Sequence, residues 1–299
     1  MSTATTDVTP PASFTASFEE LGLISPLLAR LTELEYQQPT PIQAQAIPSV
    51  LAGRDLIAGA NTGSGKTATF ALPLLQQLHA EKSSGSKNRE GNYVTGLILV
   101  PTRELVIQVV DEIEKLAKYI NVRVLGVYGG TNINTQKMAV AQGTDIIVAT
   151  PGRLYDLAIS RAIQLKSVQK LVIDEVDVML DLGFRFQLMN IFDVIPERRQ
   201  NILFSATMTE DVDALIYDFF KKPEKISVAV SGTPLDNIEQ ISYNIPNFFT
   251  KVNLLHYLLS DKESFNKVLI FVGFKRTADL LFKHMQEMFN EEMCIIHSN

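Results

Sequence analysis

The chain has 299 residues, of which 46% are apolar and 20% charged, a balance typical of a globular protein with a core and not of a disordered chain. Its net charge of -6 argues against a broad basic surface for non-specific nucleic-acid binding, and its single cysteine, Cys294, excludes an internal disulfide framework. No apolar run reaches the roughly 20 residues of a membrane-spanning helix. Residues 1–17 contain neither Lys nor Arg, so they resemble neither a signal peptide nor a transit peptide. We therefore expect a disordered tail over residues 1–17 and a cytoplasmic protein without a membrane partner.

Short apolar runs rich in Val, Ile and Leu recur along the first two thirds of the chain, and helical patterns separate several of them. The runs cover residues 56–58, 97–100, 124–127, 146–148, 171–173 and 202–204. Runs of this kind are typical of parallel strands covered on both faces. Between the second and third runs, residues 104–120 carry apolar side chains at helical spacing. This alternation predicts an α/β fold with a doubly wound parallel sheet over residues 18–230.

Two stretches interrupt the alternation. Residues 81–92 (EKSSGSKNREGN) have no apolar side chain and predict an exposed, flexible loop, and residues 231–240 begin with SGTP and predict an interdomain linker. Beyond the linker, residues 241–299 offer a strand at 268–272, a helix around 277–289 and another strand near 294–296. Fifty-nine residues are too few for a second doubly wound domain, so we expect only the N-terminal part of one there.

The sharpest local motif follows the first strand candidate. Residues 60–67 read ANTGSGKT and precede a helical stretch, which is the sequence context of a phosphate-binding loop. Glycines let backbone N–H groups curl around phosphate oxygens at a helix N-terminus, Lys66 can reach the β- and γ-phosphates, and the Thr67 hydroxyl can bind Mg²⁺. The alternative is a glycine-rich turn between a strand and a helix.

An acidic cluster follows the strand candidate at residues 171–173. In an open parallel sheet, ligands gather beyond the carboxyl ends of the strands, so Asp174 and Glu175 should lie on the same edge as the phosphate loop. Asp174 is placed to hold Mg²⁺, usually through water, and Glu175 can polarise an attacking water. The alternative is a solvated loop, which the pairing with the phosphate loop disfavours.

These two motifs, with others in the same order across residues 18–299, resemble the DEAD-box ATP-dependent RNA helicases of superfamily 2. Residues 174–177 (DEVD) resemble the name-giving motif with Val176 in place of Ala, and residues 60–67 resemble motif I with Asn61 where Gln is common. The overall similarity points toward the RhlE-like bacterial branch. The resemblance implies RecA-like domains and an RNA-dependent ATPase that separates short RNA duplexes, with ATP and Mg²⁺ as cofactors and RNA as partner. It implies catalytic roles for Lys66, Asp174 and Glu175.

The resemblance also implies a nucleotide site. Residues 39–43 (PTPIQ) resemble the Q motif, in which Gln43 would hydrogen-bond the adenine edge and the upstream Phe18 would stack on the ring. Without the resemblance, the same residues read as a stiff turn before a helix. The implied nucleotide-binding residues are Phe18, Gln43, Thr62, Gly63, Ser64, Gly65, Lys66 and Thr67, with Thr67 and Asp174 at the metal.

Three further segments resemble RNA-binding motifs of the family and directly follow strand candidates. The implied RNA-binding residues are Thr102 and Arg103 in motif Ia, Gly129 and Gly130 in the glycine doublet, and Thr150 and Arg153 in motif Ib. Such side chains and loop N–H groups bind phosphates, so the sequence specificity should be low. Without the resemblance, the alternative is that these segments are turns at the end of the sheet and that the arginines form structural ion pairs.

Residues 205–207 (SAT) resemble motif III, which in the family couples the nucleotide site to unwinding. Hydroxyl groups at the end of a strand can bond the carboxylate of Asp177, so Asp177, Ser205 and Thr207 are the implied coupling residues.

Motifs V and VI of the family have no counterpart before Asn299, so we expect this chain to bind nucleotide and to hydrolyse it poorly. Two alternatives stay open. One is a DNA-directed translocase of superfamily 2, and the other is a nucleotide- or RNA-binding module with little catalysis.

Overall fold

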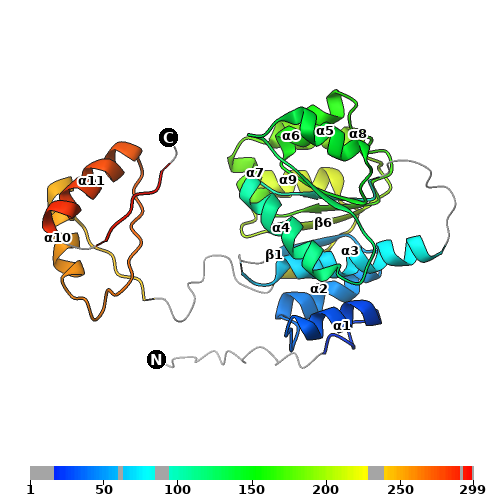
Figure 1. The fold of residues 1–299 in the computed structure, drawn as a ribbon, viewed down its shortest axis with the longest axis horizontal. Coiled ribbons are helices and arrows are strands. Elements are labelled where there is room, and N and C mark those ends of the chain that lie inside the picture. The colour runs from blue at the N-terminus through cyan, green and yellow to red at the C-terminus, as the bar shows by residue number, and fades with distance from the viewer. Residues whose placement is uncertain (1–16, 60–62, 85–93, 228–238, 290–291, 298–299) are drawn as a thin grey trace, which may run out of the picture. The chain divides into compact units, whose positions relative to one another are not determined.

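The computed structural model describes residues 17–59, 63–84, 94–227, 239–289 and 292–297 (Figure 1). The chain divides into two compact units, residues 1–233 and residues 234–299. The predicted tail, most of the predicted loop over residues 81–92 and most of the predicted linker lie outside the described residues. Within them, no helix combines the length and the apolar character needed to cross a bilayer.

The first unit is built on a sheet whose strands all run parallel. Its strands are β1 (Leu56–Gly59), β2 (Gly96–Leu99), β3 (Val124–Val127), β4 (Ile146–Ala149), β5 (Lys170–Ile173), β6 (Gln200–Ser205) and β7 (Glu224–Ser227). Their order across the sheet is β3-β4-β2-β5-β6-β1-β7, and every neighbouring pair is parallel. The doubly wound sheet predicted from the six apolar runs is confirmed, and β7 adds an edge strand beside β1.

Helices cover both faces of this sheet (Figure 1). They are α1 (Ser25–Glu33), α2 (Pro41–Leu51), α3 (Lys66–Ser83), α4 (Arg103–Leu116), α5 (Ile133–Ala141), α6 (Pro151–Ile159), α7 (Val176–Asp181), α8 (Arg185–Val194) and α9 (Glu210–Phe219). Alternate residues of one strand point to opposite faces, so Leu56 and Ala58 join the core under α1 to α4, whereas Ile57 joins the core under α5 to α9. The inner strands are therefore buried on both sides, which explains why most of them read as apolar runs, whereas the edge strands β3 and β7 are only partly buried.

Two helices show how local sequence sets the elements. In α4, buried Val106, Val109, Ile113 and Leu116 recur at the predicted helical spacing, and the Thr102 hydroxyl accepts a hydrogen bond from the Leu105 N–H at the N-terminus. Helix α3 continues through residue 83, so the prediction that residues 81–83 belong to a loop is wrong. These residues extend an existing helix, and Lys82 anchors it by an ion pair of 2.7 Å between its Nζ and Asp145 Oδ2.

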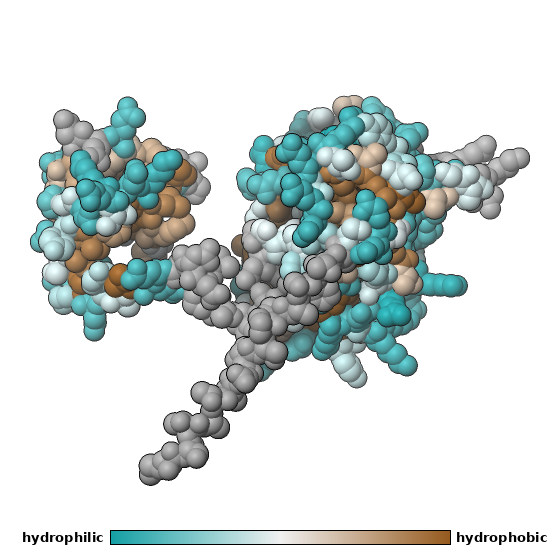
Figure 2. Space-filling model, turned by 90° about the horizontal axis from the view of Figure 1, so that it is seen from below, coloured by the Kyte–Doolittle hydropathy of each residue, from teal (hydrophilic) through white to brown (hydrophobic). Residues whose placement is uncertain are grey.

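The second unit contains α10 (Phe248–Leu259) and α11 (Lys275–Met288). The predicted helix around residues 277–289 is confirmed, but the predicted strands at 268–272 and 294–296 are wrong, because neither segment adopts strand structure. A strand exists through hydrogen bonds to a neighbouring strand, and neither segment pairs with one among the described residues. Phe271 is 87% exposed and Leu269 75% exposed, and Figure 2 shows apolar surface among hydrophilic side chains on this unit. An apolar run alone is thus insufficient to form a strand.

Candidate active site

Residues 63–65, the described part of the connection between β1 and α3, lead directly into the N-terminus of α3. Gly63 has a φ of 83° and Gly65 a φ of 89°, conformations that side chains with a Cβ rarely adopt, which explains the glycines. Ser64 lies between them, and Lys66 and Thr67 are the first two residues of α3. The backbone N–H groups of this first turn have no partner within the helix, so the loop and the helix N-terminus can bind an anion. Thr62 lies outside the described residues.

The loop places Lys66 beside the acidic segment that follows β5. Lys66 Nζ lies 3.4 Å from Asp174 Oδ1, and the two side chains are only 7% and 4% exposed. Burial raises the pKa of Asp174, and the positive charge of Lys66 partly opposes this rise. Lys66 Nζ, Asp174 Oδ1 and Ser64 Oγ are buried and lack a hydrogen-bond partner among the described residues. Three buried polar atoms short of partners mark a place where a ligand with oxygen atoms would complete the bonding.

Glu175 follows Asp174 at the N-terminus of α7. Its backbone lies in the left-handed region, with a φ of 55° and a ψ of 50°. The Glu175 N–H donates to the Asp174 carboxylate, which lowers the pKa of Asp174 against the larger effect of burial. The turn therefore carries two adjacent carboxylates beyond the end of one central strand, on the same edge of the sheet as the phosphate loop.

Asp177, in the first turn of α7, is bonded to the segment that follows β6. The backbone N–H and the hydroxyl of Thr207 both donate to Asp177 Oδ2, each at 2.9 Å. The Ser205 hydroxyl donates instead to the Thr207 carbonyl oxygen at 2.6 Å. Ser205 is thus linked to Asp177 through Thr207, to which both residues are hydrogen-bonded. Asp177 is 8% exposed, so its partners are fixed in a nearly buried position.

The start of α2 is bonded directly to the phosphate loop. Gln43 is 1% exposed; its Oε1 accepts from the Thr40 N–H at 2.9 Å, and its Nε2 donates to the Gly65 carbonyl at 3.1 Å. The Thr40 hydroxyl donates to the Ser64 carbonyl at 2.9 Å. A Cβ added to Gly65 would lie 2.5 Å from Gln43 Nε2, so this close approach also requires glycine. One amide hydrogen of Gln43 and one lone pair of its oxygen remain for another partner.

Phe18 is placed differently from Gln43. It is 4% exposed within the core under α1 to α4, and its ring centroid lies 6.3 Å from that of Tyr36. Little of the ring is therefore open to solvent in this structure. The structure brings the phosphate loop, Gln43 and the acidic segment together, whereas it packs the Phe18 ring into the core.

A second group of predicted residues follows β2 and β3. Arg103 is exposed at the N-terminus of α4, and its guanidinium lies 5.2 Å from the centroid of the Tyr128 ring. A Cβ added to Gly130 would lie 3.8 Å from Arg103 Nη1, and Gly130 has a φ of 79°. Arg103 and the Gly129–Gly130 turn are thus neighbours, and Thr102 beside them caps α4 through its hydroxyl.

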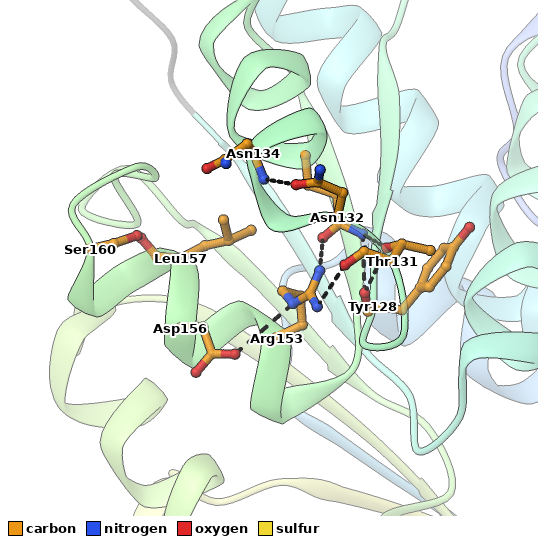
Figure 3. Close-up of polar contacts among 9 residues, drawn as sticks. Tyr128, Thr131, Asn132, Asn134, Arg153, Asp156, Leu157 and Ser160 are labelled. Atoms are coloured by element: carbon orange, nitrogen blue, oxygen red, sulfur yellow. Dashed lines mark hydrogen bonds and ion pairs between the residues drawn. The ribbon is translucent and has the colours of Figure 1, made fainter.

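Thr150 and Arg153 lie at the start of α6, beyond β4. Thr150 is buried, and its N–H donates to the Val127 carbonyl at 3.1 Å. Arg153 Nη1 donates to Gln136 Oε1 at 3.1 Å, and Nη2 donates to the Thr131 carbonyl at 3.0 Å (Figure 3). Its Nε lies 3.9 Å from Asp156 Oδ2, and the side chain is 11% exposed. Arg153 is therefore bonded to the segment after β3.

Comparison with known proteins agrees with this geometry. A protein-family model described as DEAD/DEAH box helicase matches residues 40–215, which include the phosphate loop and the acidic segment. The chain belongs to the DEAD/DEAH box helicase family. One similar protein is the DEAD-box ATP-dependent RNA helicase CshA of Bacillus cereus, which is 38% identical over 265 residues, or 89% of this chain and 48% of the relative. Another is the ATP-dependent RNA helicase DeaD of Escherichia coli, which is 38% identical over 88% of this chain and 40% of the relative. The chain thus spans about half the length of the curated helicases it matches.

Solved structures of helicases support the same fold. A DEAD box protein from Methanococcus jannaschii matches with a TM-score of 0.66 and 34% identity, over 91% of this chain and 70% of that one. A hypothetical ATP-dependent RNA helicase from Sulfolobus tokodaii matches with a TM-score of 0.60 and 34% identity, over 68% of this chain and 56% of that one. The placement in an RhlE-like branch stays a prediction.

Three polar residues of this helicase site were not singled out by the sequence: Thr40, Thr131 and Gln136. Thr40 carries a readable signal, because Thr40 and Gln43 have the spacing of a helix capping box. Thr131 and Gln136 carry none in a single sequence, since a polar residue in the first turns of a helix is ordinary. Their roles follow only from which loops the sheet brings together.

Proposed function

We propose that this chain supplies the ATP-binding domain of an ATP-dependent RNA helicase, which couples ATP binding and hydrolysis to local unwinding or remodelling of RNA. The domain corresponds to residues 18–230, and residues 241–299 to the start of a second RecA-like domain. The observation that carries the proposal is the buried pair of Lys66 and Asp174, 3.4 Å apart beside a glycine-rich loop. The names of the CshA and DeaD relatives agree with it.

In this proposal the phosphates of ATP lie against the loop before α3. Backbone N–H groups of Gly63, Ser64 and Gly65 donate to phosphate oxygens, and Lys66 donates to the β- and γ-phosphates. Gln43 bonds the adenine edge with its remaining hydrogen and lone pair, which requires that its amide become accessible, because the side chain is 1% exposed in this structure. Stacking of Phe18 on the base requires that its ring become accessible, because the ring is 4% exposed in this structure.

The residues beside Lys66 fit Mg²⁺. Thr67 and Asp174 offer a hydroxyl and a carboxylate, and Mg²⁺ typically takes one or two such ligands together with phosphate oxygens and water. The described residues contain no group of three His, Cys, Asp or Glu side chains able to hold a metal, so the remaining ligands would come from the nucleotide. Bound there, Mg²⁺ would neutralise charge on the phosphates.

Hydrolysis requires that a water be oriented toward the γ-phosphate. We assign this role to the Glu175 carboxylate, which follows directly after Asp174 and can accept a proton from the water. Asp177, Ser205 and Thr207 are the proposed coupling residues, since their bonds tie α7 to the end of β6.

RNA is the proposed partner at the neighbouring strand ends. Arg103 is exposed beside the Gly129–Gly130 turn, and Thr102, Thr150 and Arg153 lie at the N-termini of two helices. Helix N-termini and glycine turns offer N–H donors to phosphates, which gives contacts to the backbone and little sequence specificity. A cytoplasmic location belongs to the same proposal.

The test is the ATPase activity of the chain, with and without single-stranded RNA, in wild type and Glu175→Gln. We expect RNA to stimulate turnover and the substitution to reduce it by about 10²- to 10⁴-fold, the usual contribution of a general base. Glu197→Gln is the matched control, because Glu197 is exposed and pairs with Lys221.

Each arm of this experiment has a contrary outcome. Stimulation by single-stranded DNA but not by RNA would favour the DNA-directed translocase. A wild-type chain that binds ATP and RNA but turns over no ATP would favour the non-catalytic module. Equal rates for wild type and Glu175→Gln would remove Glu175 from the catalytic role.

A further inference from the structure

Gln136 in the first turns of α5 is a buried polar side chain with hydrogen bonds to three residues in two segments, the turn after β3 and the first turn of α6. It is 9% exposed. Its Nε2 donates to the Tyr128 carbonyl at 3.0 Å and to the Thr131 hydroxyl at 2.7 Å, and its Oε1 accepts from Arg153 Nη1 at 3.1 Å. Both amide hydrogens are therefore used, together with one of the two lone pairs on the oxygen.

The partners of Gln136 surround the Gly129–Gly130 turn. Tyr128 precedes the two glycines and Thr131 follows them, so Gln136 holds both ends of the turn. Glycines have the largest conformational freedom in the backbone, and Gly130 with its φ of 79° makes no packing contact through a side chain. The Thr131 hydroxyl also donates to the Tyr128 carbonyl at 3.3 Å, and the two bonds from Gln136 to the same groups add to this restraint on the turn.

Gln136 also holds the side chain of Arg153. It donates to Gln136 through Nη1 and to the Thr131 carbonyl through Nη2, so the first turn of α6 is tied to the turn after β3 (Figure 3). Asn132 caps α5 by accepting from the Asn134 N–H at 2.9 Å, which fixes the start of the helix that carries Gln136. The segment over residues 128–136, which follows β3, and the first turn of α6, which follows β4, are thus joined into one arrangement.

An apolar side chain in the place of Gln136 would leave Arg153 Nη1 without this acceptor, and the Tyr128 carbonyl and the Thr131 hydroxyl with one bond fewer, so glutamine contributes to stability as well as to position. The contribution to position is directional: it fixes where the glycine turn and the Arg153 guanidinium lie relative to each other. Fixing a binding surface before the ligand arrives lowers the entropic cost of binding.

We propose that Gln136 is a positioning residue for nucleic-acid binding, which holds the Gly129–Gly130 turn and Arg153 in one geometry toward the RNA phosphate backbone. The inference rests on the proposed function, because it takes those residues as the RNA-binding ones. Gln136 itself touches no phosphate and acts through its three partners.

The test compares wild type with Gln136→Met, which keeps the length of the side chain and removes its three hydrogen bonds. Gln136→Ala is a second variant in case the methionine packs poorly. Binding of a fluorescein-labelled oligouridine is measured by anisotropy, and binding of a fluorescent ATP analogue is measured on the same samples. We expect RNA affinity to fall about tenfold, equivalent to about 1.4 kcal/mol, and nucleotide affinity to stay unchanged.

Gln142→Met is the matched control. Gln142 ends the same helix, and its Oε1 accepts from Arg123 Nη2 at 2.8 Å, so the control removes a similar bond next to the start of β3. RNA affinity should not change. Amide hydrogen exchange supplies an independent readout: in Gln136→Met, exchange should accelerate over residues 128–136 and 151–154 and nowhere else.

The results separate the two proposals. A wild-type chain that binds no oligouridine overturns the proposed RNA binding and this inference with it. If the wild type binds and Gln136→Met binds within twofold of it, only the inference fails. A parallel loss of RNA and nucleotide affinity in both Gln136 variants also overturns the inference, because it would make Gln136 a general structural residue.

Discussion

Two regions at the carboxyl ends of the strands differ in how the hydrogen-bonding groups of their buried side chains are satisfied. Around the phosphate loop, Lys66, Asp174 and Ser64 each have a buried polar atom without a hydrogen-bond partner in the described residues. Around the glycine turn, Gln136 and Arg153 are bonded to each other and to Tyr128 and Thr131. Within the described residues, the first region therefore leaves buried polar atoms available for a ligand, whereas the second is bonded internally. Nucleotide binding should therefore stabilise the phosphate loop strongly, and RNA binding should change the conformation of the glycine turn little.

The largest effect is expected from removing the charge at Lys66. In Lys66→Met, nucleotide affinity should fall about ten- to a hundredfold, because a charge-assisted hydrogen bond is worth about 1.5–3 kcal/mol. Stability should also acquire a stronger pH dependence. Without the lysine, the pKa of buried Asp174 rises further above its ordinary value of 3.8. The folded chain then retains a proton that the unfolded chain loses, so stability falls as pH rises through that interval.

Thermal unfolding at several pH values and titration with a fluorescent nucleotide measure these two effects. Lys82→Met is the control on the same helix, since Lys82 is partly exposed and pairs with Asp145. A Lys66→Met protein that keeps wild-type nucleotide affinity would contradict the view that this region is completed by a ligand.

A smaller effect is expected at the link between α7 and β6. Thr207→Val removes the hydroxyl that donates to Asp177 Oδ2, while the backbone N–H of residue 207 still donates to the same atom. Because one of two bonds to a nearly buried carboxylate is lost, the free energy of unfolding should fall by about 1 kcal/mol, or about 2–4 °C in Tm. Thr207→Ser keeps the hydroxyl and should restore most of the loss, measured by calorimetry. An unchanged Tm in Thr207→Val would show that the N–H alone satisfies Asp177.

The smallest effect is expected at an exposed cluster on α1. Hydrogen bonds from Lys118, Tyr119 and Arg30 lower the pKa of Glu33 to about 2. Its contribution to stability is present above the ordinary pKa of 4.5 and is lost as pH falls from there toward 2. Because Glu33 is exposed and screened by solvent, Glu33→Gln should change Tm only slightly at pH 7 and not at all near pH 2. A large change at neutral pH would show that exposed ion pairs matter as much as the buried pair of Lys66 and Asp174.

The sequence predicted most of the sheet, because its inner strands are buried on both faces and so have a simple apolar signature, whereas the edge strand β7 (EKIS) is partly exposed and has none. It predicted the phosphate loop for a similar reason: the backbone of Gly63 and Gly65 requires glycine, and their spacing from Lys66 is fixed. The same reasoning failed at residues 268–272, where an apolar run has no neighbouring strand among the described residues. Strand formation depends on partners that a local pattern does not contain.

The hydrogen bonds between loops could not be predicted from the sequence either. Gln43 was singled out for the adenine base, but its bond to Gly65 was not foreseen, because residues 43 and 65 meet only after α2 packs against α3. Gln136 likewise shows no pattern that distinguishes it from any polar residue in a surface helix. Contacts of this kind depend on sheet order, which places β3 next to β4 and not next to β2.

The left-handed backbone of Glu175 has a consequence for how this protein can change over time. A residue with a Cβ in that conformation costs about 1–2 kcal/mol, a cost that glycine would not carry. A chain selected for stability alone would replace Glu175 and lose the carboxylate proposed to activate water. Glycine at position 175 would favour thermal stability, whereas glutamate supplies the carboxylate proposed to activate water, so the two requirements favour different residues.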